Sequence, residues 1–211
     1  FAGTGDAFVK TWYSQTGSGK DFTQTSTAQQ PRIVNAGAVD QINSKPAVYF
    51  NQSRADHLAG AWDESTKANF SIFISTQPYD LNPNQTYFSW NNSFLAVKHK
   101  QSMLRGTSAL FQFNTFPNFS IDTPYIRSLC VNGTSGSYVS YENGVEQFSA
   151  TFANWTGFRT STNQDHKMGS RTSSLEPLYG YIQEMVIYYD DDQTNNQSAI
   201  QGALNDYYSV Y

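Results

Sequence analysis

The chain is poor in cysteine, in charge and in long apolar runs. Its one cysteine, Cys130, can form no intrachain disulfide and no cysteine-ligated metal site, and the apolar residues around it predict a buried structural thiol. Charged residues make up 14% of the chain and the net charge is −4, so no basic face for nucleic acid is expected. No apolar run approaches the roughly 20 residues that span a bilayer, so membrane insertion is not expected either.

Aromatic residues are abundant instead, at 16% of the chain. Together with many Ser, Thr, Asn, Gln and Gly residues, they are typical of an extracellular β-rich domain and too frequent for a disordered chain. A length of 211 residues suits one domain over residues 1–211. The chain begins without a signal-peptide pattern, which indicates a mature protein or an excised domain.

The chain also carries eight Asn-x-Ser/Thr sequences, about twice the number that this composition gives by chance. If they are glycosylated, the protein is secreted or lies on a virion surface made in a eukaryotic host. The alternative is a polar bacterial or phage protein that is never glycosylated. The candidate acceptors are Asn51, Asn69, Asn84, Asn91, Asn118, Asn132, Asn154 and Asn196.

Short apolar or alternating segments, separated by Gly, Asn, Pro and Ser turns, predict an all-β sandwich. Asn143-Gly144 supplies the positive φ angles of a tight type I′ turn, which predicts a hairpin there. The strands are expected at 8–13, 46–50, 70–75, 86–90, 94–97, 108–113, 125–131, 138–141, 146–151 and 180–189.

One helix is predicted at the end of the chain. Thr194 and Gln197 fit a capping box, in which each side chain bonds a free backbone N–H group of the first turn. Apolar residues then recur at helical spacing and predict a face that packs on the sandwich: Ile200, Leu204, Tyr207 or Tyr208, and Tyr211. The carboxylates of 190–192 complement the positive end of the helix dipole, which we favour over a calcium site.

Four segments of the chain resemble one superfamily of folds. They read "WYSQTGSG" at 12–19, "QPRIV" at 30–34, "KPAVYF" at 45–50 and "YIQEMVIYY" at 181–189. In this order they are similar to the concanavalin A-like lectin/glucanase superfamily, and more closely to its laminin-G-like jelly-roll modules. The resemblance covers nearly the whole chain, and it implies a two-sheet antiparallel jelly-roll sandwich with a short C-terminal helix.

The same resemblance bears on metals. Modules of this kind often hold one calcium ion with an aspartate and backbone carbonyls, and Asp6, Asp63 and Asp165 are candidates that the sequence does not separate. The three histidines, His57, His99 and His166, are scattered, and each is expected to be a single surface side chain.

A glycine-rich stretch at 11–24 raises the question of a ligand loop. Gly17 and Gly19 permit a turn, and no Lys-Ser/Thr pair follows them, so a phosphate loop is excluded and a hairpin turn is predicted. A related arabinofuranosidase domain carries a similar hairpin, but Ser14 stands where that pattern often has Asp.

Catalysis by paired carboxylates is not indicated. The Glu-x-Asp-x-x-Glu motif of the superfamily's glucanases is absent, and hydrolysis of a glycosidic bond needs two carboxyl groups set across it. The nearest candidates are the neighbours Asp63 and Glu64, then Glu142 and Glu146, which flank a turn where charges are normally solvated, and Glu184.

Sugar binding is better supported, because an aromatic ring beside polar groups matches the apolar face and hydroxyl edge of a sugar. The candidate ligand-binding residues are Trp62 with Asp63, Trp90 with Asn91 and Asn92, and Trp155 with Arg159. The alternative for each tryptophan is a core or rim anchor with its indole N–H satisfied.

The sequence therefore predicts a non-catalytic module that binds a glycan or another surface ligand, within a larger extracellular or virion-surface protein. The expected partners are a surface polysaccharide or glycan and the other domains of that protein. A purely structural module of an appendage, capsid or adhesin is the first alternative, and a glycoside hydrolase is the second.

Overall fold

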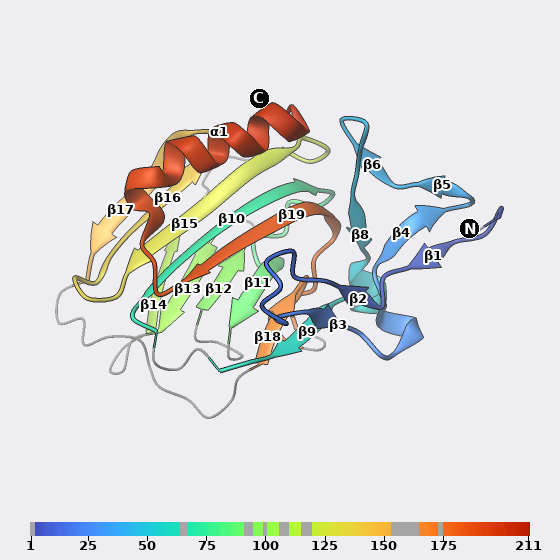
Figure 1. Ribbon diagram of the computed structural model, residues 1–211, viewed down its shortest axis with the longest axis horizontal. Coiled ribbons are helices and arrows are strands. Elements are labelled where there is room, and N and C mark those ends of the chain that lie inside the picture. The colour runs from blue at the N-terminus through green and yellow to red at the C-terminus, as the bar shows by residue number, and fades with distance from the viewer. Residues whose placement is uncertain are drawn as a thin grey trace.

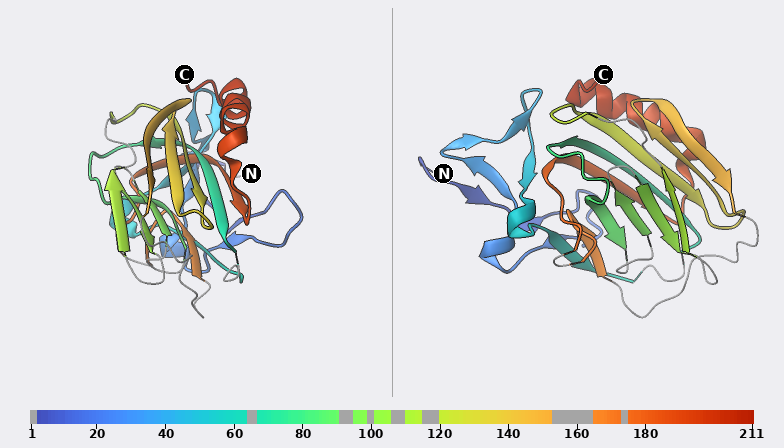
Figure 2. Two further views of the ribbon diagram at one scale, coloured as in Figure 1. Left: turned by 90° about the vertical axis from the view of Figure 1, so that its left-hand side faces the viewer. Right: turned by 180° about the vertical axis from the view of Figure 1, so that it is seen from behind.

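A computed structural model describes residues 3–63, 67–90, 95–98, 101–105, 110–114, 120–152, 165–172 and 175–211. Two antiparallel sheets face one another, and a single helix lies on the outer face of the upper sheet (Figure 1). A smaller lobe at the N-terminal end of the chain extends from one side of the sandwich (Figure 2).

The upper sheet has a long central pair of strands, β10 and β19, joined over nearly their full length. In spatial order its strands are β1 (Ala7–Phe8), β4 (Arg32–Asn35), β8 (Val48–Phe50), β19 (Gly180–Tyr189), β10 (Asn69–Pro78), β15 (Tyr125–Asn132), β16 (Ser137–Glu142) and β17 (Val145–Thr151), with β5 (Ala38–Val39) beside β4.

The lower sheet faces these strands across the core. Its order is β14 (Leu110–Asn114), β13 (Gln101–Arg105), β12 (Leu95–Lys98), β11 (Thr86–Trp90), β18 (Asp165–Met168), β9 (Leu58–Ala61), β3 (Phe22–Thr23) and β2 (Thr11–Trp12). The strands β6 (Gln41–Ile42) and β7 (Lys45–Pro46) form a separate hairpin, and short 3-10 turns lie at Thr27–Gln29, Gln52–Arg54 and Gln193–Asn196.

Alternation along β10 explains the two layers of the core. Phe70, Ile72 and Ile74 are fully buried between the sheets, because alternate residues of a strand point to the same face. Phe73 points the opposite way and is buried under the helix. The prediction of a two-sheet antiparallel sandwich with a C-terminal helix is confirmed, and β11 and β19 have the predicted bounds.

The N-terminal strand is the main difference from the sequence-based prediction. The segment 8–13 is not one strand: β1 pairs with β4 in the upper sheet, and β2 pairs with β3 in the lower sheet. Between them the Val9 N–H donates to the Pro31 carbonyl, and the Lys10 carbonyl accepts from the Gln24 N–H. The alternation of side chains along 8–13 could not reveal this break, because each of the two short strands keeps the two-residue period of a β-strand.

The helix α1 runs from Gln197 to Tyr208 and packs through Leu204 and Tyr208, while Tyr207 and Tyr211 are exposed. The predicted capping box is wrong. A 3-10 turn precedes the helix, and its N-cap is Asp192, whose carboxylate accepts from the Thr194 N–H. Of the three carboxylates at 190–192, which were expected to complement the start of the helix, Asp192 caps the turn that precedes it.

The predicted burial of the cysteine is confirmed, whereas the predicted exposure of two histidines is wrong. Cys130 is fully buried, as predicted, and burial raises the pKa of its thiol to about 12. His57 and His166 were expected at the surface, but they are 5% and 0% exposed. His99 lies outside the described residues. Within the described part of the chain, no helix is long and apolar enough to cross a membrane.

Candidate functional site

A pocket of about 410 Å³ lies where the two sheets part, between the β2–β3 hairpin and β19. Its apolar side is formed by Trp12 and Phe22 from the lower sheet, by Trp62 just after β9, and by residues 185–189 of β19. Hydroxyl, amide and charged groups complete its lining: Ser14, Gln15, Thr16, Ser18, Lys20, Glu184 and Asp191. An apolar cleft with a few convergent polar groups is the usual form of a small-ligand site.

The hairpin is a turn, as predicted, and it also lines the pocket. Trp12 pairs with Phe22 across the two strands, and Gly17 and Gly19 adopt φ angles of +68° and +70° that favour glycine. At its tip the Ser14 hydroxyl lies 2.9 Å from the hydroxyls of both Thr16 and Ser18. The tip therefore presents a group of hydroxyls to one side of the pocket.

The hairpin is anchored at its base by a backbone bond to a carboxylate. The Ser14 N–H donates to Asp21 Oδ1 at 2.8 Å. Lys20 then projects toward β19, with its Nζ 4.8 Å from the centre of the Tyr189 ring. These contacts hold the loop beside β19, and Tyr13, which is 64% exposed, also lines the pocket.

Three aromatic rings form a continuous stack beneath the pocket. Trp62 stacks on His166 with ring centres 4.4 Å apart and planes inclined by 13°, and His166 stacks on Trp90 at 5.6 Å and 17°. Phe22 meets Trp62 edge-on at 5.0 Å. His166 is fully buried because it lies between these rings. In the sheet, β18 places it opposite Gly60 of β9.

One edge of β19 borders the pocket. β19 pairs with β10 along its length but with β8 only over 180–182. No described strand pairs with that second edge beyond Ile182, and residues 184–189 line the pocket there. A strand edge without a neighbouring strand presents a row of backbone N–H and C=O groups.

The described members of the predicted ligand-binding set, Trp62, Asp63 and Trp90, differ in their surroundings. Trp62 lines the pocket, and Asp63 is exposed beside it. Trp90 is 3% exposed and packs on Phe70 and His166, so it is a core anchor and we do not include it in the binding surface. The remaining members, Asn91, Asn92, Trp155 and Arg159, lie outside the described residues.

The glycosylation candidates differ in exposure. Asn84 and Asn196 are exposed, whereas Asn51, Asn69 and Asn132 are partly buried. The Asn132 amide donates to Asp192 Oδ2 at 3.2 Å, so a glycan attached to that nitrogen would replace this hydrogen bond. Asn91, Asn118 and Asn154 lie outside the described residues. Glycosylation stays a prediction.

The described carboxylates among the nearest catalytic candidates have different surroundings. Glu142 is 9% exposed and pairs with Arg127 at 2.8 Å, which corrects the expectation that it is solvated at its turn. Glu146 accepts from the Ser149 hydroxyl. Of the described candidates only Glu184 lines the pocket, and its Oε2 accepts from the Tyr208 hydroxyl at 2.5 Å. Glu64 lies outside the described residues.

Of the calcium candidates, Asp165 lies opposite Ala61, two residues from Asp63, whereas Asp6 precedes β1 of the other sheet. Asp6 Oδ1 accepts from the Ala36 N–H at 2.8 Å, and Asp63 and Asp165 are exposed. In the described part of the chain, no group of three His, Cys, Asp or Glu side chains could hold a metal ion.

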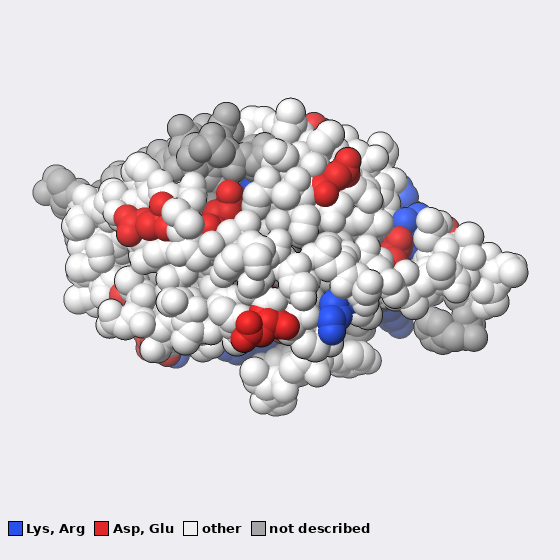
Figure 3. Space-filling view, turned by 90° about the horizontal axis from the view of Figure 1, so that it is seen from above, with Lys and Arg blue, Asp and Glu red and all other residues white. Residues whose placement is uncertain are grey.

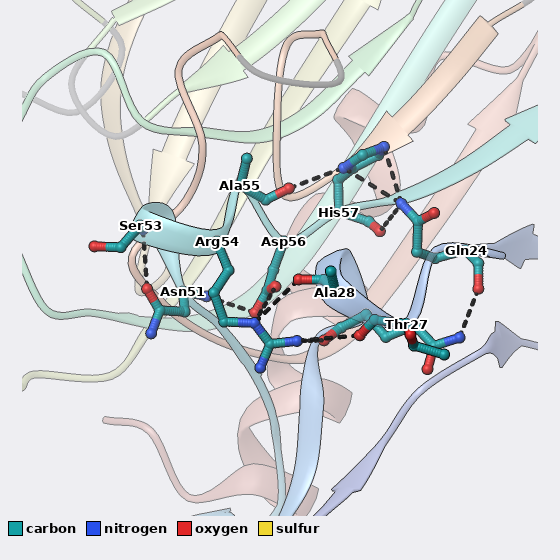
Figure 4. Close-up of polar contacts among 10 residues, drawn as sticks. Gln24, Thr27, Ala28, Asn51, Ser53, Arg54, Ala55, Asp56 and His57 are labelled. Carbon is teal, nitrogen blue, oxygen red and sulfur yellow. Dashed lines mark hydrogen bonds and ion pairs between the residues drawn. The ribbon is translucent and has the colours of Figure 1, made fainter.

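A second polar cluster lies away from the pocket, at the connection between β8 and β9 (Figure 4). Arg54 Nε donates to the Ala28 carbonyl, and Asp56 Oδ2 accepts from the Asn51 N–H. Burial raises the pKa of Asp56 to about 6 and lowers the pKa of His57. These contacts join two connecting segments, which gives the cluster a structural explanation.

No family model and no curated protein matches the chain. Solved structures do. They include NanB, a sialidase from Streptococcus pneumoniae, with Optactamide (TM-score 0.56, 12% identity, 73% of this chain and 27% of that chain). The CBM40 of a Ruminococcus gnavus sialidase, bound to α2,3-sialyllactose, has a TM-score of 0.54 and 15% identity over 64% of this chain and 83% of that one.

A third match is the binding domain of botulinum neurotoxin DC in complex with rat synaptotagmin II. Its TM-score is 0.51 at 13% identity, over 70% of this chain and 40% of that one. The chain thus spans about a quarter of NanB and most of the CBM40 structure. At such low identity these likenesses show the fold, which is the jelly-roll β-sandwich that the sequence predicted.

Proposed function

We propose that this chain is a non-catalytic glycan-binding module, and that the pocket between the β2–β3 hairpin and β19 receives a sugar ring. The observation that carries the proposal is the composition of the pocket. Trp62 and Trp12 offer apolar ring surface, while Ser14 and Gln15 offer a hydroxyl and an amide at its rim. Sugars carry flat apolar faces edged by hydroxyls, so this pairing suits them.

The solved structures of similar fold support the class of ligand. One is reported with α2,3-sialyllactose, and a study of botulinum neurotoxin type C reports two ganglioside molecules. The chain is placed, on this proposal, in a larger extracellular or virion-surface protein. The exposed sequences at Asn84 and Asn196 are compatible with that setting.

The absence of catalysis is part of the proposal. Retaining and inverting glycosidases place two carboxyl groups roughly 5 to 9.5 Å apart across the bond. Glu184 is engaged by the Tyr208 hydroxyl, and Asp191 is the other carboxylate among the described lining residues. We assign both to ligand contact. Release of a product from any bound glycan would contradict this assignment.

The test is a glycan array probed with the whole chain, in calcium and again in EDTA. Trp62→Ala should reduce binding about fivefold or more, since a stacked ring contributes on the order of 1 kcal/mol or more. Gln15→Ala removes an exposed rim amide without touching the core, so it should fold normally and bind more weakly.

Tyr207→Ala is the matched aromatic control, because Tyr207 is 57% exposed on α1 and does not line the pocket. It should bind as the parent does. If no glycan binds in either buffer, the glycan-binding proposal is wrong and a structural module is the better account. If a glycan binds but Trp62→Ala and Gln15→Ala both bind it like the parent, the assignment of binding to this pocket is wrong.

A further inference from the structure

We propose that the pocket selects neutral sugars and disfavours sugars that carry a carboxylate, such as terminal sialic acid. This inference rests on the proposed glycan-binding function and adds the class of sugar to it. The charged side chains around the pocket support it. The fold that the chain shares with a sialyllactose-binding domain is not used as evidence for the class of sugar.

Negative charge predominates around the pocket. Glu184 and Asp191 line it from β19 and the residues just after that strand. A third carboxylate, Asp21, lies at the base of the hairpin, where it accepts from the Ser14 N–H. Lys20 is the one cationic side chain among the described lining residues. A ligand carboxylate placed here would therefore meet more like charge than opposite charge.

The position of Lys20 reduces its use as a partner for an anion. Its ammonium lies 4.8 Å from the centre of the Tyr189 ring, in the geometry of a cation–π contact. No arginine lines the pocket within the described residues. Arginine is the side chain that holds a carboxylate through two parallel hydrogen bonds. The described lining therefore lacks the contact that would bind the carboxylate of an acidic sugar most strongly.

The groups that are present suit hydroxyls instead. Ionised carboxylates only accept hydrogen bonds, and neutral sugar hydroxyls donate to them in charge-assisted bonds. The hydroxyls of Ser14, Thr16 and Ser18 can donate or accept, and that of Ser14 lies 2.9 Å from each of the other two. A neutral sugar can use both kinds of group, whereas the carboxylate of an acidic sugar finds few donors and several acceptors.

The surrounding surface does not reverse this balance. The face that carries α1 is mostly uncharged, and acidic groups are spread more widely over it than basic ones (Figure 3). The whole chain has a net charge of −4. Neither the charges on this face nor the net charge of the chain is therefore expected to attract an anionic glycan over a long range.

The experiment uses an array in which each neutral oligosaccharide is printed beside its α2,3-sialylated form. We expect neutral forms to bind at least about tenfold more tightly than their sialylated partners, as for a like-charge contact of a few ångströms in a partly solvated site. Raising NaCl from low to high concentration should narrow this difference, because salt screens the repulsion, and should leave neutral binding nearly unchanged.

Variants locate the effect. The double variant Glu184→Gln and Asp191→Asn keeps the shape and the acceptor for Tyr208 while removing two charges, so it should raise binding of the sialylated forms relative to the neutral ones. Asp206→Asn removes a charge from the exposed side of α1 and should not change the ratio.

The outcomes are distinguishable. Sialylated forms that bind as tightly as neutral ones, or more tightly, overturn the neutral-sugar inference and leave the glycan-binding function standing. A ratio that is unchanged in the double variant overturns the assignment of the effect to these carboxylates, and the inference with it. Failure of every printed glycan to bind overturns the proposed function itself.

Discussion

The Trp62 ring lies directly over the backbone of Gly60, two residues earlier in the chain. A Cβ atom at residue 60 would lie 1.7 Å from Cζ3 of Trp62 and 2.3 Å from its Cη2. Gly60 also faces His166 across the β9–β18 pair, and Trp62 stacks on that imidazole. The missing side chain at residue 60 is therefore what allows the indole to lie flat beside His166 and line the pocket.

We predict that Gly60→Ala displaces Trp62 and weakens glycan binding without adding any group to the pocket. The new methyl and the indole cannot occupy the same space, so the ring must leave its place on His166. Near-ultraviolet circular dichroism should change, and affinity should fall toward that of Trp62→Ala.

The matched control is Gly202→Ala, within α1, where a new Cβ meets nothing within 4 Å. It should leave binding unchanged and stabilise the helix by about 0.5–1 kcal/mol, the usual difference between Gly and Ala in a helix interior. Equal affinities for Gly60→Ala and the parent would show that Trp62 does not need its present position to serve the site.

The sequence does not distinguish the pocket residue Trp62 from the core residue Trp90. Each was expected near a predicted loop or strand end, and each precedes polar residues, so the two local patterns are similar. Trp90 lies in β11, inside the sheet, and is covered by Phe70. Trp62 follows the last residue of β9, near the edge of the lower sheet, and reaches the pocket. The difference is tertiary, and no local pattern encodes it.

Strands with strong alternation were predictable, and the pocket as a whole was not. The segments around Trp12, Trp62 and Glu184 are far apart in the sequence, and only sheet order brings them together. The hairpin at Asn143-Gly144 needed no such information, because both residues have positive φ angles, of 50° and 78°, as that dipeptide predicts.

A second prediction concerns the buried ion pair of Arg127 and Glu142. Arg127 is fully buried, with its Nε 2.8 Å from Glu142 Oε2 and its Nη1 donating to the Tyr87 hydroxyl. Glu142→Ala leaves the guanidinium buried without its carboxylate, so the free energy of unfolding should fall by about 3–5 kcal/mol. Urea denaturation measures the loss.

The control for this pair removes both charges at once. Replacing Arg127 by Met and Glu142 by Leu fills similar volumes without an ion, and such replacements are often neutral in other proteins. We expect the double variant to be more stable than Glu142→Ala. A double variant that is the less stable of the two would mean that the pair contributes more than the cost of its own desolvation.

Asp192 is predicted to stabilise the start of the C-terminal helical segment. Its carboxylate accepts from the Thr194 N–H at 3.1 Å, from the Thr194 hydroxyl at 2.5 Å and from the Asn132 amide at 3.2 Å. Asp192→Ala should lower the free energy of unfolding by about 1–2 kcal/mol, as for other lost N-caps.

The neighbouring Asp191→Ala serves as control for charge, because Asp191 is exposed and does not cap the turn. It should change stability by less than about 0.5 kcal/mol. Thermal unfolding of the two variants separates the contribution of the cap from that of the acidic run. Similar losses in both would show that total charge, rather than the hydrogen bonds of Asp192, stabilises this terminus.

The last prediction follows from Asp56, which is 1% exposed in the connection between β8 and β9. Burial raises its pKa from the ordinary value of 3.8 to about 6, although Arg54 lies 3.3 Å away and opposes the shift. Since the folded state binds the proton more tightly than the unfolded state does, protonation stabilises the fold. That contribution is fully present below about pH 4 and is lost as the pH rises through about 6.

Asp56→Asn imitates the protonated form at every pH and retains an oxygen to accept from the Asn51 N–H. The free energy of unfolding of the parent, minus that of Asp56→Asn, should therefore rise by on the order of 2–3 kcal/mol between pH 7 and pH 4. Taking the difference cancels the other titrating groups, including His57, whose lowered pKa acts in the opposite direction. Urea titrations at pH 7, 5.5 and 4 measure it. A difference that stays constant, or that falls, would mean that the Asn51 hydrogen bond and Arg54 stabilise the Asp56 carboxylate at least as much as burial penalises it.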